Sequence, residues 1–295
     1  PPPLFTPSRC HAYAKALHYK EIVFENALPS SSTIEDLIEI NKQLQQFQSA
    51  RGILEHARDH YPDQFKESWY EKLQDWTQAL DAYERLETSR SLYSDENLGV
   101  MRCQMALGSW QHLSRRASVM WDDSSLTSDK KVEVAIIGAQ AEFNLAVASD
   151  EHLAGVHWQA MESYVRAIGK DRVEGCVSRA VLAVHASELT NAQIYINAAR
   201  RILERELTAL VSESYERAYG SMVVLHQLAE LEEIVDHKAS PEALSREHLV
   251  RLFSSRLQQT ERSVEVWKQL ISVHALAVSP PDHRDTVLKY CHMCA

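Results

Sequence analysis

Hydrophobic residues recur along this chain at the spacing of one face of an α-helix. The clearest case is Trp76, Ala79, Tyr83 and Leu86, which fall at i, i+3, i+7 and i+10. The same spacing recurs at four other places: Phe47, Ala50, Leu54, Ala57; Trp110, Leu113, Ala117, Met120; Trp158, Met161, Val165, Ile168; and Leu189, Ala192, Ile196, Ala199. The leading residues lie 29, 34, 48 and 31 positions apart. These matches predict a series of amphipathic helices.

A period near 34 residues is typical of tetratricopeptide repeats, in which each repeat is a helix–turn–helix. The irregular spacing indicates degenerate repeats with insertions. We therefore predict an all-α fold, an α-solenoid of tetratricopeptide-like or HEAT-like helix pairs. A plain helical bundle is the alternative, because a short apolar template also finds chance matches. Under the repeat interpretation Trp76, Ala79, Tyr83, Trp110 and Trp158 form core contacts, with Trp76 and Trp110 buried between successive pairs.

The distribution of helix breakers supports this prediction. No proline lies between Asp63 and Ser240, and strand-like alternation is absent. Helices are expected at about 9–27, 34–45, 49–60, 130–147, 172–186 and 246–277, with two long helices within 191–238. We place a tight turn near Gln74, and a break between the two long helices near Ser212 or Gly220. The inner face of the first helix is assigned to Ala12, Ala16, Tyr19 and Val23.

Composition and charge exclude several classes of protein. The 295 residues are 45% hydrophobic and 24% charged, with a net charge of −10, which argues against a general nucleic-acid binder. No apolar run approaches the roughly 20 residues that span a bilayer. The N-terminus lacks the features of a signal peptide. Five scattered cysteines indicate reduced thiols in a cytoplasmic protein.

The two ends suggest a piece of something larger. Residues 1–8 are interpreted as a linker or as the end of a preceding segment. Residues 9–295 are interpreted as part of one helical repeat domain. The last residues, KYCHMCA, lie inside a predicted helix, so we expect the domain to continue beyond the C-terminus.

The sequence provides no arrangement typical of catalysis. It lacks GxGxxG, GxxxxGK[ST], GxSxG and HExxH patterns. His56 and His60 have a spacing that can bind metal, but a solvated helix face is the favoured interpretation. Cys291 and Cys294 form a single CxxC, for which ordinary helix positions are favoured. Acidic pairs such as Glu232–Glu233 are assigned to acidic helix faces. The basic run Arg200, Arg201 and Arg205 is assigned to a solvated face, with a phosphate site as the alternative.

Ordered stretches along nearly the whole chain resemble the FAT region of the target of rapamycin (TOR) kinases. They are CHAYAKALHYKE at 10–21, IEINKQLQ at 38–45, ESWYEKL at 67–73, RAVLAVH at 179–185, ELTALVSESYERAYGSMV at 206–223, ELEEIVDHK at 230–238 and VWKQLISVHALAVSP at 266–280. Each alone is a packing motif, but the ordered set is specific. The segment 122–160 departs from the family pattern.

The resemblance implies a helical solenoid that curls around the kinase domain of the same chain. The parent would be a serine/threonine kinase in nutrient and growth signalling, cytoplasmic or peripheral on lysosomal or vacuolar membranes. Its implied partners are Lst8 and a Raptor-type or Rictor-type subunit, in a complex that is often dimeric. ATP and Mg²⁺ would bind only in the absent kinase domain, so no catalytic residue, cofactor or metal site is assigned here. The family's association with inositol hexakisphosphate makes Arg179 and Lys289 candidates for a polyanion site.

Three functional interpretations follow. The first is a non-catalytic brace that restrains the kinase domain and contributes to complex assembly. The second is a free-standing tetratricopeptide-like adaptor that binds a peptide in its concave groove. The third, an all-helical enzyme, is disfavoured because no nucleophile is found together with a base.

Overall fold

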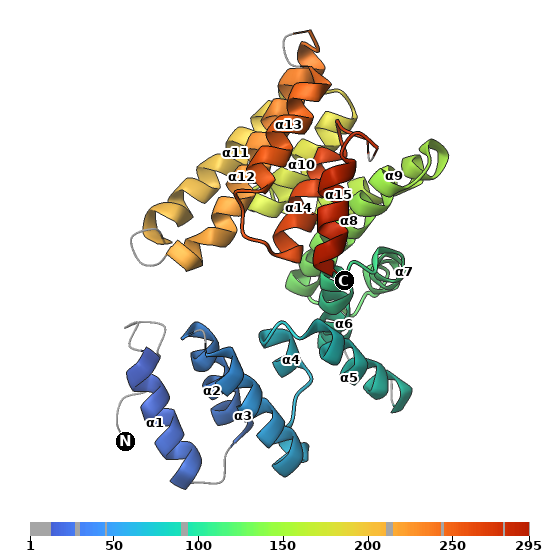
Figure 1. The fold of residues 1–295 in the computed structure, drawn as a ribbon. Helices are drawn as coiled ribbons and strands as arrows, with labels where there is room; N and C mark the ends of the chain where they lie inside the picture. Colours follow the sequence, from blue (N-terminus) through green and yellow to red (C-terminus); the bar gives the residue numbers. More distant parts are fainter. Residues whose placement is uncertain are drawn as a thin grey trace. The chain divides into compact units, whose positions relative to one another are not determined.

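The computed structural model describes residues 13–26, 30–44, 46–89, 94–210, 215–242, 245–279 and 281–294 (Figure 1). Within these ranges the regular structure consists of fifteen α-helices and one short 3₁₀ helix, and no strand is found. The predicted all-α class is confirmed. The chain divides into unit 1, residues 1–109, and unit 2, residues 110–295, which are described separately. The predicted linker at 1–8 lies outside the described residues.

The described residues of unit 1 form six α-helices. Their bounds are α1 Tyr13–Asn26, α2 Ser31–Gln43, α3 Phe47–His60, α4 Ser68–Lys72, α5 Trp76–Ser89 and α6 Ser94–Leu107, with the 3₁₀ helix Pro62–Gln64 before α4. Neighbours in sequence pack on each other, α1 on α2, α2 on α3 and α5 on α6, while the short α4 contacts α2, α5 and α6. This is the adjacent pairing expected of an α-solenoid.

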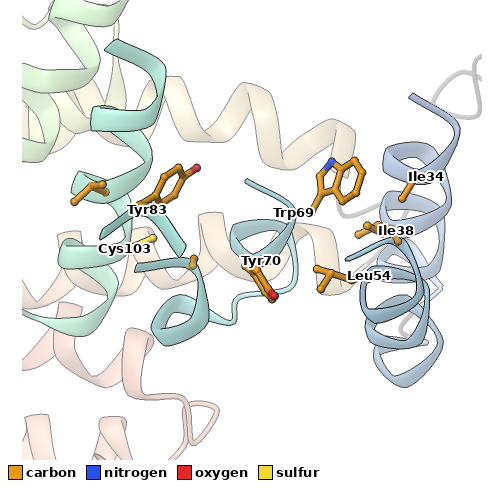
Figure 2. Close-up of a cluster of buried hydrophobic side chains, with 10 residues drawn as sticks. Ile34, Ile38, Leu54, Trp69, Tyr70, Tyr83 and Cys103 are labelled. Carbon is orange, nitrogen blue, oxygen red and sulfur yellow. The ribbon is translucent and has the colours of Figure 1, made fainter. Parts of the chain in front are cut away.

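The core of unit 1 forms around two adjacent aromatic residues of α4. Trp69 is fully buried and Tyr70 is 7% exposed. Figure 2 shows Trp69 beside Ile34 and Ile38 of α2, with Tyr83 of α5 among the buried side chains drawn in the same view. A helix of five residues therefore supplies the contacts that hold the longer helices together.

The first helix buries only part of the predicted inner face: Ala16 is partly buried, Ala12 lies outside the described residues, and the other two members are exposed. Tyr19 is 58% exposed and Val23 is 49% exposed, whereas Leu17 and Phe24 are partly buried. The sequence alone offers two apolar stripes on this helix, and packing against α2 selects one of them. The assignment of Tyr19 and Val23 to the inner face was wrong.

Unit 2 contains the other nine α-helices of the described ranges. Their bounds are α7 Trp110–Trp121, α8 Ser128–Ala148, α9 Glu151–Ala167, α10 Val173–His185, α11 Leu189–Leu210, α12 Tyr215–Ala239, α13 Arg246–Leu257, α14 Val264–His274 and α15 Arg284–Cys294. Consecutive helices again pack together, and α14 also packs on α12. Hydrogen bonds support this packing: Ser272 of α14 donates to Asn144 of α8, and Gln269 of α14 donates to Gln227 of α12.

Several predicted boundaries change in unit 2. Gly220 lies inside α12, so it does not separate the two long helices, while Ser212 lies outside the described residues. The single helix predicted at 246–277 is two helices, α13 and α14. Residues 258–263 separate them without any proline or glycine, so the usual signal of a break was absent.

One tight turn occurs where the sequence analysis placed it, and two further residues have a left-handed backbone. Gln74 has a φ of 59° between α4 and α5, at the predicted tight turn. Gly108 has a φ of 72° before Trp110, a conformation that glycine adopts readily. A third left-handed residue, Ser187 with a φ of 59°, ends α10 and was not predicted.

Replacing Gly138 by alanine is expected to destabilise the chain by about 1–3 kcal/mol, the usual range for overpacking. A Cβ atom there would lie 2.9 Å from the ring of Tyr164, which is 4% exposed and packed edge-on against Trp121. Gly155→Ala is the matched control, because a Cβ there meets nothing within 4 Å. We expect Gly155→Ala to be neutral or stabilising. Equal urea midpoints for the two variants would contradict this prediction.

Candidate functional site

The predicted core residues fall into two groups. Ala79, Tyr83 and Trp158 are 0%, 3% and 9% exposed. Trp76 and Trp110, which were expected to be buried between successive helix pairs, are only half-buried. Each is the first residue of its helix, so the preceding turn of helix that would cover one side of the ring is missing. The ammonium group of Lys268 instead lies over the ring of Trp110, 5.2 Å from the ring centroid.

A polar cluster in unit 1 ties α4, α5 and α6 together. The Glu71 carboxylate accepts a 2.5 Å hydrogen bond from the Tyr83 hydroxyl and a 2.7 Å bond from Nε of Arg102. Burial and the neighbouring Glu71 charge raise the pKa of Tyr83, so the phenol stays protonated and acts as a donor. A Cβ on Gly99 would lie 2.5 Å from the Tyr83 oxygen, so glycine leaves room for this contact. The hydrogen bonds of this cluster therefore hold α4, α5 and α6 together.

A second polar cluster, in unit 2, joins α7, α8 and α9. Glu142, 4% exposed, accepts from the Ser114 hydroxyl at 2.6 Å, and its other oxygen lies 2.6 Å from Nδ1 of His157. Both side chains therefore approach the carboxylate itself. A nucleophile–base pair would instead need the serine hydroxyl at a nitrogen of the imidazole. This arrangement joins three helices but does not activate a serine.

Arg179, a predicted polyanion ligand, uses its guanidinium within the fold. Its two terminal nitrogens donate to the backbone carbonyls of Gly175, Val165 and Ile168 at 2.6–2.9 Å. Two of these carbonyls, of Val165 and Ile168, lie at the C-terminal end of α9, where backbone acceptors lack helical partners. Arg179 therefore caps α9 from α10. Lys289 is exposed on α15.

Next to this cap is a surface cavity of about 610 Å³. Three basic side chains line it, from Arg166, Lys170 and Arg179, together with the acidic Glu162 and Glu188. Arg166 is paired with Glu162 at 2.7 Å. Trp158 and the ring of His185, stacked 4.0 Å apart, also line the cavity. Lys289 does not line it, so this cavity does not unite the two predicted ligands.

The other candidate motifs are the histidine pair of α3 and the cysteine pair of α15. His56 and His60 stack at 4.2 Å, and within the described ranges no group of three or more His, Cys, Asp or Glu side chains could hold a metal ion. Cys291 and Cys294 are free and exposed on α15. No described helix combines the length and the apolar character that crossing a bilayer would require.

Ionic contacts within unit 2 were missed by the sequence analysis. Glu232 accepts from Arg200 of α11 at 2.6 Å, and Glu233 accepts from both terminal nitrogens of Arg256 of α13. The acidic pair is thus engaged by neighbouring helices and does not form a solvated acidic face. The adjacent Glu230 is fully buried. Charges that are distant in sequence meet only after folding, so helical periodicity gave no signal of these pairs.

Comparisons with known proteins identify the family. The family model of the FAT domain matches residues 143–295. Serine/threonine-protein kinase TOR of Oryza sativa subsp. japonica is 38% identical over 317 aligned positions, which cover 97% of this chain and 12% of that protein. Serine/threonine-protein kinase mTor of Drosophila melanogaster is 41% identical over 286 positions, which cover 97% of this chain and 11% of that protein. Serine/threonine-protein kinase TOR2 of Saccharomyces cerevisiae is 36% identical over 287 positions, which cover 97% of this chain and 11% of that protein.

The chain thus spans only 11–12% of the length of these curated relatives. The similarity nevertheless extends over almost all of its own residues, in agreement with the resemblance seen in the ordered stretches. Since the family model covers more than half of the chain, and since the helices pack as sequential pairs, the chain belongs to the FAT domain family, in the form found in TOR kinases.

Proposed function

We propose that this chain is a non-catalytic helical scaffold segment of a TOR-family protein kinase, which braces and restrains the kinase domain of the same polypeptide. The observation that carries this proposal is the coverage: 97% of the chain aligns with TOR kinases, yet it accounts for only 11–12% of their length. The proposal extends to assembly with Lst8 and with Raptor-type or Rictor-type subunits, to dimeric complexes, and to nutrient signalling in the cytoplasm or on endomembranes.

The polar contacts between helices support a bracing role. A brace transmits force only if its helices do not slide past each other. In unit 1 the Glu71 cluster joins three helices. In unit 2, Ser272 bonds to Asn144, 128 positions away in sequence. Paired and hydrogen-bonded groups of this kind fix one arrangement of packed helices, because each bond would be lost if the helices shifted.

The purified chain is expected to transfer no phosphate. Phosphoryl transfer requires groups that cradle the phosphates and acids that hold Mg²⁺, and the sequence offers neither pattern. The assay is transfer of radiolabelled phosphate from ATP to a peptide substrate, with a full-length TOR kinase as the positive control. Turnover that copurifies with the chain through two orthogonal columns would contradict the proposal.

As a second proposal, retained from the family resemblance, we infer that unit 2 binds a polyanion such as inositol hexakisphosphate. The observation in its favour is the cavity lined by Arg166, Lys170 and Arg179. Cationic donors from more than one helix would make charge-assisted hydrogen bonds to phosphate oxygens. Because Arg179 already caps α9 and Arg166 is paired with Glu162, Lys170 would provide most of the free donor capacity.

Inositol hexakisphosphate is expected to raise the thermal midpoint of the chain, since a ligand that binds only the folded state stabilises it. Lys170→Gln should reduce this shift. Lys289→Gln is the matched control, because Lys289 is exposed and does not line the cavity. A shift that is unchanged in Lys170→Gln and lost in Lys289→Gln would place the site elsewhere.

A further inference from the structure

A carboxylate without a permanent cationic partner is fully buried in α12. Glu230 is 0% exposed. Its two oxygens face two imidazoles: Nε2 of His226, one turn earlier on α12, lies 3.2 Å from Oε1, and Nε2 of His274 on α14 lies 3.0 Å from Oε2. His274 is 1% exposed. An ionised carboxylate in such surroundings is strongly unfavourable unless a positive charge compensates it.

The geometry makes this contact depend on charge. The nitrogen–oxygen separations are those of ion pairs, yet neither oxygen of Glu230 takes part in a well-aligned hydrogen bond. The ring of His274 is stacked on Phe253 with centroids 4.4 Å apart, and its Nδ1 has no partner. With poor hydrogen-bond alignment, the attraction between α12 and α14 at this point is mainly the Coulomb term between carboxylate and imidazolium.

Several charged groups on the surrounding helices are engaged elsewhere. On α12 itself, Glu232 pairs with Arg200 of α11, and Glu233 pairs with Arg256 of α13. Lys238 donates to the backbone carbonyl of Val184 at the end of α10. Lys268 of α14 lies over the ring of Trp110. These contacts leave the two histidines as the described groups that face Glu230 directly.

A third histidine borders the cluster but carries no charge near neutral pH. His283 precedes α15, and its ring centroid lies 5.1 Å from that of His274. Burial, followed by the charge on His274, lowers the pKa of His283 to about 4. Its Nε2 lies 3.3 Å from the Ser254 hydroxyl of α13. His283 is therefore an uncharged residue at the border of the cluster.

The Glu230 carboxyl itself stays ionised. Burial alone would raise the pKa of Glu230, but the facing nitrogens of His226 and His274 outweigh burial and hold that pKa below its usual range. His226 provides a route for proton exchange, since its side chain is 21% exposed while the carboxylate is 0% exposed.

We propose that the packing of α14 on α12 requires a proton held by His226 or His274 opposite Glu230, so that unit 2 opens at this contact when the proton is lost. Stabilisation by a protonated imidazole opposite the carboxylate is lost as the pH rises and the proton leaves. Protonation of Glu230 removes the same contact only in acid, because the facing imidazoles depress the pKa of that carboxyl.

The proposal is tested by urea unfolding at pH 6, 7 and 8 of three proteins: the parent chain, Glu230→Gln and Glu233→Gln. One released proton lowers the folding equilibrium constant by up to tenfold per pH unit. We expect the ratio of folding constants, parent over Glu230→Gln, to fall at least about threefold between pH 6 and pH 8. Glu233→Gln is the matched control on the same helix; because Arg256 stays charged, its ratio to the parent should not change with pH. Parallel pH profiles for the parent and Glu230→Gln would overturn the proposal.

Hydrogen–deuterium exchange of the unmodified chain provides a test that needs no variant. After correction for the intrinsic pH dependence of exchange, protection of α14, residues 264–274, should fall at least about threefold from pH 6 to pH 8. Protection of α3, residues 47–60 in unit 1, serves as the internal reference and should stay constant. Equal changes in α14 and α3, or no change in α14, would contradict the proposal. The inference does not depend on the proposed bracing function.

Discussion

Replacing Trp69 by alanine is expected to destabilise unit 1 by about 3–5 kcal/mol, the range for truncating large core aromatics. Trp69 is fully buried and packs beside Ile34 and Ile38 of α2 (Figure 2). Its ring also makes an edge contact with Phe65 at 5.5 Å. Truncation to alanine would therefore leave a cavity among buried side chains.

Urea unfolding monitored by circular dichroism measures this loss. Phe47→Ala is the control, since Phe47 is 50% exposed and its truncation should change stability by less than about 0.5 kcal/mol. Trp76→Ala should fall between the two, because Trp76 is half-buried at the start of α5. A loss below about 1 kcal/mol for Trp69→Ala would mean that α4 does not organise the unit.

Leu17→Pro is expected to destabilise the pairing of α1 with α2 by about 3 kcal/mol or more. Leu17 lies inside α1 and is partly buried. Proline there removes a backbone hydrogen bond and clashes with the carbonyl four residues earlier. Limited proteolysis should show faster cleavage within residues 13–60, because the ion pair between Lys20 and Asp36 joins α1 to α2 and would be lost with the helix.

Ser31→Pro is the matched control for the proline itself. Ser31 is the first residue of α2 and follows the N-cap Ser30, a position where proline is tolerated. Ser30 has φ and ψ of −82° and 155°, which suit a residue before proline. If both variants accelerated proteolysis equally, the effect would not arise from disruption of α1.

Helical periodicity predicted the class of fold and several elements closely. The helix beginning at Trp110 ends at Trp121, and the turn at Gln74 lies between α4 and α5. These features depend on neighbours within a few positions. A repeated apolar spacing, a glycine before a helix and a polar turn are all local signals, so a single sequence contains them.

Features that depend on contacts between distant helices could not be predicted in this way. The pairing of Glu230 with His274 joins residues 44 positions apart, and no spacing rule connects them. The capping role of Arg179 depends on the position of the end of α9 beside α10. The buried face of α1 was partly misassigned because Tyr19 and Val23 have helical spacing yet are exposed. Tertiary packing selected among alternatives that were locally equivalent.

We propose that this chain restrains a kinase domain and does not merely support it. If so, loosening α1 shifts the population of the full-length kinase toward an open, accessible state. An element that only supports the active site would have the opposite effect, since its damage would lower activity.

The most direct measurement is phosphorylation of a peptide substrate by the full-length kinase complex, normalised to the amount of folded protein, with Leu17→Pro compared with Ser31→Pro. Our account predicts that Leu17→Pro keeps or raises the activity, while proteolysis within residues 13–60 becomes faster and Ser31→Pro resembles the parent. Activity that falls in proportion to the unfolding of α1 would contradict the account.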